Sequence, residues 1–142
     1  MNSYRIISEL NEQQISELIE LYTHEVWSQN RSREDVTKML AASNVVIGLV
    51  DDYDHLIAFI RVLTDFVYRA FIYDVIVKAS HRNQGVGKKL MDSVVDHPRL
   101  QTVERLGLSC LPEMIPFYER WGFTSEVGGV QLMARINQNP AR

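Results

Sequence analysis

The sequence predicts an α/β (α+β) fold in which about four helices flank a central sheet that is mixed but mostly antiparallel. Two amphipathic helical segments occupy the first third of the chain. Three apolar, strand-like runs then follow one another with short connections, which is typical of an antiparallel meander. A strand–helix–strand order comes next and predicts a crossover.

The first elements are a short strand and two capped helices. Residues 4–7 form an apolar run that predicts the first strand. Asn11 can cap the following helix, with Gln14 as its capping-box partner. The apolar face of that helix is expected at Ile15, Leu18, Ile19, Tyr22 and Val26. Ser32 and Asp35 form a second capping pair, ahead of a helix with apolar positions at Val36, Met39 and Leu40.

The middle of the chain predicts three strands, at 45–50, 56–63 and 70–77, with a polar turn at 51–54 between the first two. The third run is apolar or aromatic at every position except Asp74, which is typical of a strand that is covered on both faces. Asp74 is the only charged residue of this run, so it is a candidate for a special role.

The second half predicts a helix that opens near Gly85, a strand at 106–110, a short helix at 112–121 and a last strand at 130–136. The glycine is expected to ease the turn from strand to helix. These elements complete the predicted crossover and add one strand after it.

Composition and length limit the class of protein. A chain of 142 residues predicts a single domain over 1–142, with a frayed tail at 136–142. The net charge of −3 gives no field that would gather nucleic acid or an anionic membrane. No apolar run is long enough to cross a bilayer, and the histidines show no metal-binding spacing. Because the chain has a single cysteine, Cys110, and no recognisable signal peptide, we expect a cytoplasmic protein. From the spacing of the histidines we expect no bound metal.

The segment HRNQGVGKKL at 81–90 carries two glycines and several cations directly after a strand. It is not a P-loop, because Lys89 stands where that motif requires serine or threonine. It is not a dinucleotide fingerprint either, because Leu90 stands where the third glycine is needed. The pattern that remains is Arg-x-x-Gly-x-Gly, formed by Arg82, Gly85 and Gly87.

Such a segment can bind an anion. The first turn of a helix has N–H groups without partners, and its dipole favours negative charge. A pyrophosphate would suit this arrangement, since Arg82 and Lys88 add positive charge. The alternative is a turn that glycine merely eases. The candidate binding residues are Arg82, Asn83, Gln84, Gly85, Val86, Gly87 and Lys88.

YDVIVKASHRNQGVGKKL followed by IPFYERWGF resembles the acetyl-CoA-binding core of the GNAT superfamily of N-acetyltransferases. In that family an Arg/Gln-x-x-Gly-x-Gly/Ala loop holds the pyrophosphate of coenzyme A, and a later Phe-Tyr-x-x-x-Gly-Phe segment places a tyrosine at the thioester sulfur. Tyr118, Gly122 and Phe123 match the second segment. The resemblance is strongest over 70–123. The TD-x-x-Y and DVIV patterns are also similar to plastid arylalkylamine acetyltransferases of plants.

The resemblance implies the GNAT fold, acetyl-CoA as cosubstrate and direct attack of an amine through a tetrahedral intermediate. The acetyl-pantetheine arm would lie between the strands at 70–77 and 106–110 and would hydrogen-bond to backbone near Val75 and Val77. A backbone N–H near Val77 would stabilise the oxyanion. Tyr118 would give a proton to the departing sulfur, although an aromatic residue of the core is the alternative interpretation.

The group that takes the proton of the attacking amine is less evident. Some family members carry a glutamate where this sequence has Phe71. Asp74 is the first candidate for a catalytic carboxylate, and a structural acid that bonds a neighbouring loop is the equal alternative. Asp65, Tyr73, Glu113 and ordered water are weaker candidates. Trp27 lies in a region that lines the acceptor pocket in this family, and a core anchor is its alternative.

The sequence therefore predicts an N-acetyltransferase that acts on a primary amine, with a small molecule favoured over a protein as the acceptor. A non-catalytic acyl-CoA-binding module on the same fold, a protein N-acetyltransferase and an unrelated phosphate-binding protein are the alternatives. A homodimer through an exposed final strand is a further expectation.

Overall fold

The computed structural model describes residues 3–138. The chain divides into two compact units, and the boundary lies between Ser109 and Cys110. The single-domain interpretation of 1–142 stays a prediction, and most of the predicted tail lies outside the described residues.

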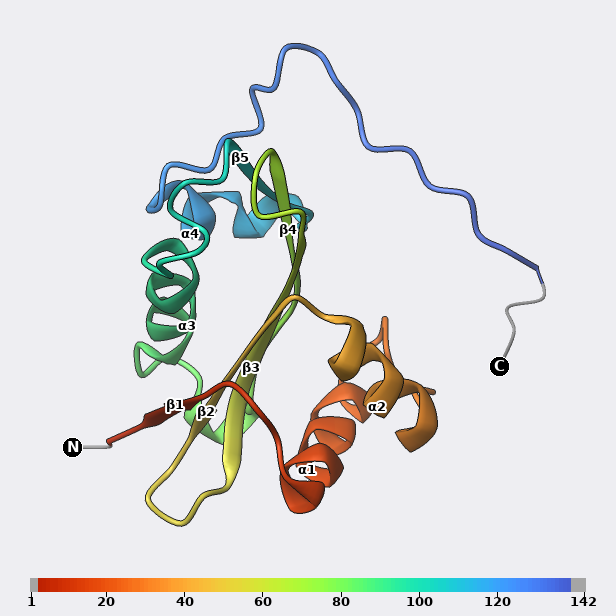
Figure 1. The fold of residues 1–142 in the computed structure, drawn as a ribbon, viewed down its shortest axis with the longest axis vertical. Helices are drawn as coiled ribbons and strands as arrows, with labels where there is room; N and C mark the ends of the chain where they lie inside the picture. The colour runs from red at the N-terminus through yellow and green to blue at the C-terminus, as the bar shows by residue number, and fades with distance from the viewer. Residues whose placement is uncertain (1–2, 139–142) are drawn as a thin grey trace. The chain divides into compact units, whose positions relative to one another are not determined.

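The first unit is built on a five-stranded sheet with the spatial order β1-β2-β3-β4-β5 (Figure 1). All neighbouring pairs are antiparallel except β4 and β5, which are parallel. The predicted mixed, mostly antiparallel sheet is therefore confirmed. The strands are β1 (Arg5–Ile7), β2 (Val45–Val50), β3 (Leu56–Thr64), β4 (Arg69–Val77) and β5 (Arg105–Leu108).

Helices cover both faces of this sheet. Figure 1 shows α1 (Glu12–Thr23) and α2 (Arg33–Ala42) on one face and α3 (Val86–Val95) on the other. The predicted capping box at the start of α1 is present, since the Asn11 and Gln14 side chains bond each other's backbone N–H. A short 3-10 helix, η1 (Ala79–His81), connects β4 to the loop before α3.

The core has two layers, one on each side of the sheet. Residues 56–60 of β3 are all buried, because helices lie over both faces. On one side Leu18 and Tyr22 of α1 pack with Phe59 in a single apolar cluster. On the other side α3 buries Val86, Leu90, Met91 and Val94. These layers fix the ends of β4 and α3 relative to each other.

The helical prediction for the first helix extended too far. Val26 was expected on its apolar face, but α1 ends at Thr23 and Val26 is 89% exposed. Three- and four-residue spacing continues by chance into the segment 24–32, which connects α1 to α2. None of the helices in the described part of the chain is long and apolar enough to cross a membrane.

A bulge interrupts β4 at Asp74. Phe59 pairs with Ile76 and Arg61 pairs with Tyr73, so β4 has one more residue than β3 between these two pairs. Asp74 has a φ of 57°, which places it in the left-handed region that few residues other than glycine adopt. A conformation of this kind costs free energy and occurs often at functional sites.

The second unit contains η2 (Pro112–Met114) and the five-residue α4 (Ile115–Glu119), where a single helix over 112–121 was predicted. The predicted strand at 130–136 is wrong, because these residues form no ladder in the structure. Their apolar side chains are exposed, with Val130, Leu132, Met133 and Ile136 at 69% to 91%. Alternating apolar residues favour a strand only where a neighbouring strand is available to pair.

Candidate active site

The loop before α3 has the geometry of an anion site. Gly85 is the N-cap of α3 and has a φ of 77°, so a glycine is suited to this position by conformation. No described side chain caps this helix, which leaves the amides of its first turn open. A Cβ added at Gly85 would meet no atom of the described residues within 4 Å, so the space beside these amides is open. Asn83 also has a positive φ, of 61°.

Cations stand around this loop, and each has a partner within the first unit. Arg82 donates from Nε to the carbonyl of Val77 at 3.2 Å and approaches the carboxylate of Glu25 at 3.4 Å. Lys88 forms an ion pair with Asp92 at 2.6 Å on the surface of α3. Both cations remain more than half exposed, so a ligand can reach them. Arg82 thereby connects the loop to the end of β4.

One side of β4 is open beyond the middle of the strand. Pairing with β5 begins at Arg69 and ends at Ile72, which lies opposite Leu108. Residues 73–77 continue the strand without a partner on that side among the described residues, and they include Val75 and Val77. An unpaired strand edge is a template for an extended ligand with amide groups. The open edge leads directly through η1 to the loop of Arg82.

Asp74 is held by three donors on a single oxygen. Its Oδ2 accepts from Nε of Arg61 at 2.7 Å, from the hydroxyl of Tyr22 at 2.8 Å and from Nη1 of Arg31 at 2.9 Å. The Asp74 side chain is only 6% exposed. We call these four residues (Tyr22, Arg31, Arg61 and Asp74) the Asp74 cluster. Arg31 comes from the segment 24–32, so the cluster ties that segment to β4.

The surroundings of Asp74 keep it ionised. Burial by itself raises the pKa of this carboxyl, but the hydrogen bond and charge of Arg61, with the charge of Arg31, outweigh burial. The pKa therefore lies below the ordinary value of 3.8. A general base works best with a pKa near the working pH. These contacts favour the structural interpretation of Asp74, in which it bonds a neighbouring loop.

Aromatic rings surround the two arginines of the Asp74 cluster. The guanidinium of Arg31 lies 4.5 Å from the ring centroid of Tyr22 and 5.4 Å from that of Trp27. The guanidinium of Arg61 lies 5.0 Å from the ring of Tyr73. Trp27 is 51% exposed and is therefore not a core anchor. Burial and the neighbouring Asp74 raise the pKa of the Tyr22 hydroxyl, which stays protonated.

Tyr118 lies on α4 in the second unit. Its ring contacts Phe117, with the centroids 5.0 Å apart, and Phe123, with the centroids 6.4 Å apart. The side chain is buried, and this burial, followed by the proximity of Cys110, raises the pKa of the phenol above 10.0. Tyr118 therefore carries its proton at neutral pH, as a proton donor must. The catalytic role of Tyr118 stays a prediction.

Asp65, one of the weaker candidates, has a structural task. Asp65 accepts from the backbone N–H groups of Val67, Tyr68 and Arg69, which lowers its pKa and shapes the turn between β3 and β4. Cys110 is an exposed thiol. Within residues 3–138 no group of three or more histidine, cysteine and acidic side chains could hold a metal ion.

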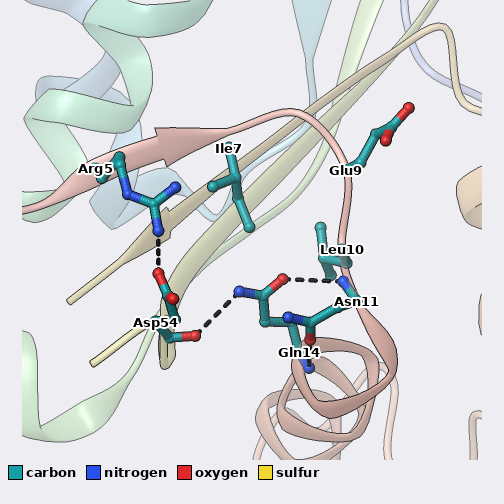
Figure 2. A pocket seen from close by; sticks show the side chains of 7 residues that line it. All are labelled: Arg5, Ile7, Glu9, Leu10, Asn11, Gln14 and Asp54. Carbon is teal, nitrogen blue, oxygen red and sulfur yellow. Dashed lines mark hydrogen bonds and ion pairs between the residues drawn. The ribbon is translucent and has the colours of Figure 1, made fainter. Parts of the chain in front are cut away.

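Figure 2 shows a pocket at the start of α1, and none of the predicted site residues lines it. Its polar side chains other than Glu9 are already paired. Arg5 forms an ion pair with Asp54, and the Gln14 amide donates to the carbonyl of Asp54 at 3.0 Å. The residues that line it are Arg5, Ile7, Glu9, Leu10, Asn11, Gln14 and Asp54. The pocket thus lies between the turn before β3 and the N-terminus of α1, and Arg5, Gln14 and Asp54 hold that junction together.

Comparisons with known proteins identify the family. The model of the acetyltransferase (GNAT) family matches residues 12–123. An uncharacterized N-acetyltransferase, ycf52-like, of Prochlorococcus marinus is 31% identical over 127 residues, which is 87% of this chain and 70% of that protein. The chloroplastic serotonin N-acetyltransferase 2 of Oryza sativa is 31% identical over 78 residues, which is 55% of this chain and 39% of that protein.

A solved structure agrees with these matches. A protein of Xanthomonas campestris described as belonging to the GNAT family superimposes with a TM-score of 0.83 at 29% identity, over 96% of this chain and 95% of that one. The chain belongs to the acetyltransferase (GNAT) family, a class of acyltransferase enzymes. The predicted family and fold are thereby confirmed. The chain spans about half the length of several curated relatives that it matches, between 42% and 61%.

Sequence analysis missed Arg31 and Arg61 as partners of Asp74. The sequence did contain a signal for Arg61. Arg61 is the only charged residue of β3, and Asp74 is the only charged residue in the apolar part of β4. Two opposite charges, each alone in one of two neighbouring buried strands, are expected to pair. Arg31 gave no such signal, because it lies in a segment with several other charges.

Proposed function

We propose that this protein transfers an acetyl group from acetyl-CoA to the primary amine of a small molecule. The observation that carries the proposal is the continuous path in the first unit from the open edge of β4 to the uncapped start of α3. The edge suits the amide groups of the pantetheine arm, near Val75 and Val77. The loop from Arg82 to Lys88 suits the pyrophosphate.

The proposed reaction needs no covalent intermediate on the protein. The amine nitrogen attacks the thioester carbonyl, and a backbone N–H of β4 near Val77 stabilises the oxyanion. The carbon–sulfur bond then breaks, and Tyr118 supplies the proton that the sulfur takes up. Asp74 is already occupied by two arginines, so water is the better candidate for removing the proton of the amine.

Serotonin is the acceptor named in the rice relative, and this name supports arylalkylamines as one class to test. A protein amine and a non-catalytic acyl-CoA module remain the alternatives. A cytoplasmic location stays a prediction, as does a homodimer, although residues 130–136, on which the dimer rested, form no strand in the structure.

The test is release of free thiol from acetyl-CoA in the presence of amines. Arylalkylamines, polyamines, amino acids, aminoglycosides and a lysine-rich peptide are assayed side by side, with Tyr118→Phe as the variant. We expect turnover with a small amine, lost in the variant while acetyl-CoA still binds. Saturable binding of acetyl-CoA without turnover of any amine would favour the non-catalytic module. Turnover of the peptide alone would favour a protein acceptor.

A further inference from the structure

The Asp74 cluster contains unequal numbers of opposite charges. Arg31 and Arg61 each carry a positive charge, whereas Asp74 carries the only negative charge that contacts them among the described residues. Tyr22 stays neutral, because its pKa is raised. The net charge is therefore +1, at side chains that are 31%, 13% and 6% exposed for Arg31, Arg61 and Asp74. A partly buried excess charge is costly without an anion to balance it.

Both arginines have donors to spare. Within the part of the chain that the structure describes, Arg31 donates only through Nη1 and Arg61 only through Nε. A guanidinium carries five N–H groups in a planar fork that matches carboxylates and phosphates. No buried side-chain nitrogen or oxygen among these residues lacks a partner, so the unused N–H groups reach solvent. These N–H groups are therefore not engaged by other described residues and are available to an anion that binds at this surface.

The cluster lies where the proposed reaction takes place. Asp74 is one of the residues of β4 that have no described partner on the side of β5, and its left-handed backbone forms the bulge there. Trp27 and Tyr73 are exposed aromatic residues next to the two guanidinium groups. The result is a positive, aromatic-walled surface next to the edge that would hold the thioester.

From these observations we infer that the acceptor amine also carries an anionic group, a carboxylate or a phosphate, which binds to Arg31 and Arg61. This inference rests on the proposed function and narrows its substrate class. Asp74 is then a positioning residue that holds both guanidinium groups in place. The positive charge of the cluster also lowers the pKa of a nearby ammonium group, which helps to produce the neutral amine that attacks.

Pairs of acceptors that differ only in the anionic group provide the test. We would compare 5-hydroxytryptophan with serotonin, lysine with cadaverine and glucosamine 6-phosphate with glucosamine. At least one anionic member should have a kcat/KM about 10- to 100-fold above its partner, which is the range for a hydrogen-bonded charged group. The first two pairs test a carboxylate and the third tests a phosphate.

Arg31→Gln should remove this preference by raising KM for the anionic acceptor, with the Kd for acetyl-CoA unchanged. Asp74 keeps Arg61 and Tyr22 as partners in this variant, so the fold should persist. Arg33→Gln is the matched control, because Arg33 lies nearby in sequence but pairs with Glu12 at 2.6 Å. The control should keep the preference.

Each outcome decides the inference. Equal or better turnover of every partner that lacks the anionic group would overturn it and leave the proposed function intact. If no acceptor is turned over, calorimetry on the protein saturated with coenzyme A decides instead. Binding of an anionic acceptor that Arg31→Gln weakens about tenfold or more would support the anion site although the proposed function fails. No binding of any anionic acceptor would overturn the inference.

Discussion

Replacement of Asp74 by asparagine should destabilise the first unit strongly. The change removes one negative charge and leaves the side chain nearly the same size. Three donors lie within 2.9 Å of Oδ2, and two of them are cations. The asparagine side chain is not a full substitute, since its carbonyl oxygen can take the place of Oδ2 but carries no negative charge. Arg31 and Arg61 would then stand side by side without an anion.

The magnitude follows from the exposure of each partner. A hydrogen bond to a charged group contributes about 1.5–3 kcal/mol, and Arg61, at 13% exposure, should lose an amount in that range. Arg31 is 31% exposed, so water replaces much of its interaction and we assign it less than about 1 kcal/mol. The sum is about 3 kcal/mol. For a chain of this length about 3 °C of Tm corresponds to 1 kcal/mol, so Tm should fall by about 9 °C.

Thermal unfolding followed by circular dichroism, with urea titration for the free energy, measures this loss. The matched control is Glu104→Gln, because Glu104 and Arg69 form an ion pair in which both side chains are at least 60% exposed. The control should shift Tm by less than about 2 °C. A Tm for Asp74→Asn within the range of the control would refute the argument.

The same reasoning predicts a pH dependence with a definite sign. The pKa of Asp74 in the folded protein lies below 3.8, so its contribution to stability is fully present above about pH 4 to 5. It is lost as the pH falls below 3.8 towards the folded value. The difference in unfolding free energy between wild type and Asp74→Asn should therefore be constant near neutral pH and shrink below about pH 4. A difference that persists unchanged at about pH 2 would contradict the assignment.

Three further predictions concern other positions. Gly85→Asp should raise the Kd for acetyl-CoA about 10- to 100-fold, because a carboxylate beside the first turn of α3 repels a pyrophosphate. Gly85→Asn is the control, because asparagine tolerates the same positive φ, and it should raise the Kd only a few-fold. Equal effects in the two variants would argue against repulsion between charges as the cause. Tyr118→Phe should lower kcat about 100-fold and leave the KM for acetyl-CoA unchanged. Because the pKa of Tyr118 is raised by burial, the loss that comes from its deprotonation should occur at a higher pH than for an ordinary tyrosine, and the variant should lack this loss. Gly48→Ala should cost about 1–3 kcal/mol, because its Cβ would lie 2.9 Å from Leu56 and 3.0 Å from Ile7; an unchanged urea midpoint would show that β1 and β3 yield without cost.

Local patterns predicted most of the fold. The capping box at Asn11 and the strand–helix boundary at Gly85 depend on residues within one turn of each other, so the sequence displays them directly. The strand at 130–136 failed for the opposite reason. Its alternation is regular, but a strand also requires a partner, and no short stretch of sequence shows whether one is available.

The candidate site likewise has a part that the sequence predicted and a part that it did not. The loop from Arg82 to Lys88 is contiguous and could be recognised as a motif. The partners of Asp74 lie 13, 43 and 52 residues away in sequence, so only the folded chain brings them together. A lone acid in an apolar strand indicated that a partner must exist but not which one. For that reason the sequence left catalytic and structural interpretations of Asp74 equally open.

The contact between Arg82 and Glu25 has a consequence for the order of events in a catalytic cycle. Glu25 belongs to the same connecting segment as Trp27 and Arg31, and its carboxylate lies 3.4 Å from the guanidinium. An incoming diphosphate brings more negative charge than this carboxylate and would draw Arg82 away from it. Binding of acetyl-CoA would thus break the contact between Arg82 and Glu25, which is one of the contacts that hold the segment 24–32 in place. We therefore expect acetyl-CoA to bind first and the amine to bind next to a segment that has become more mobile.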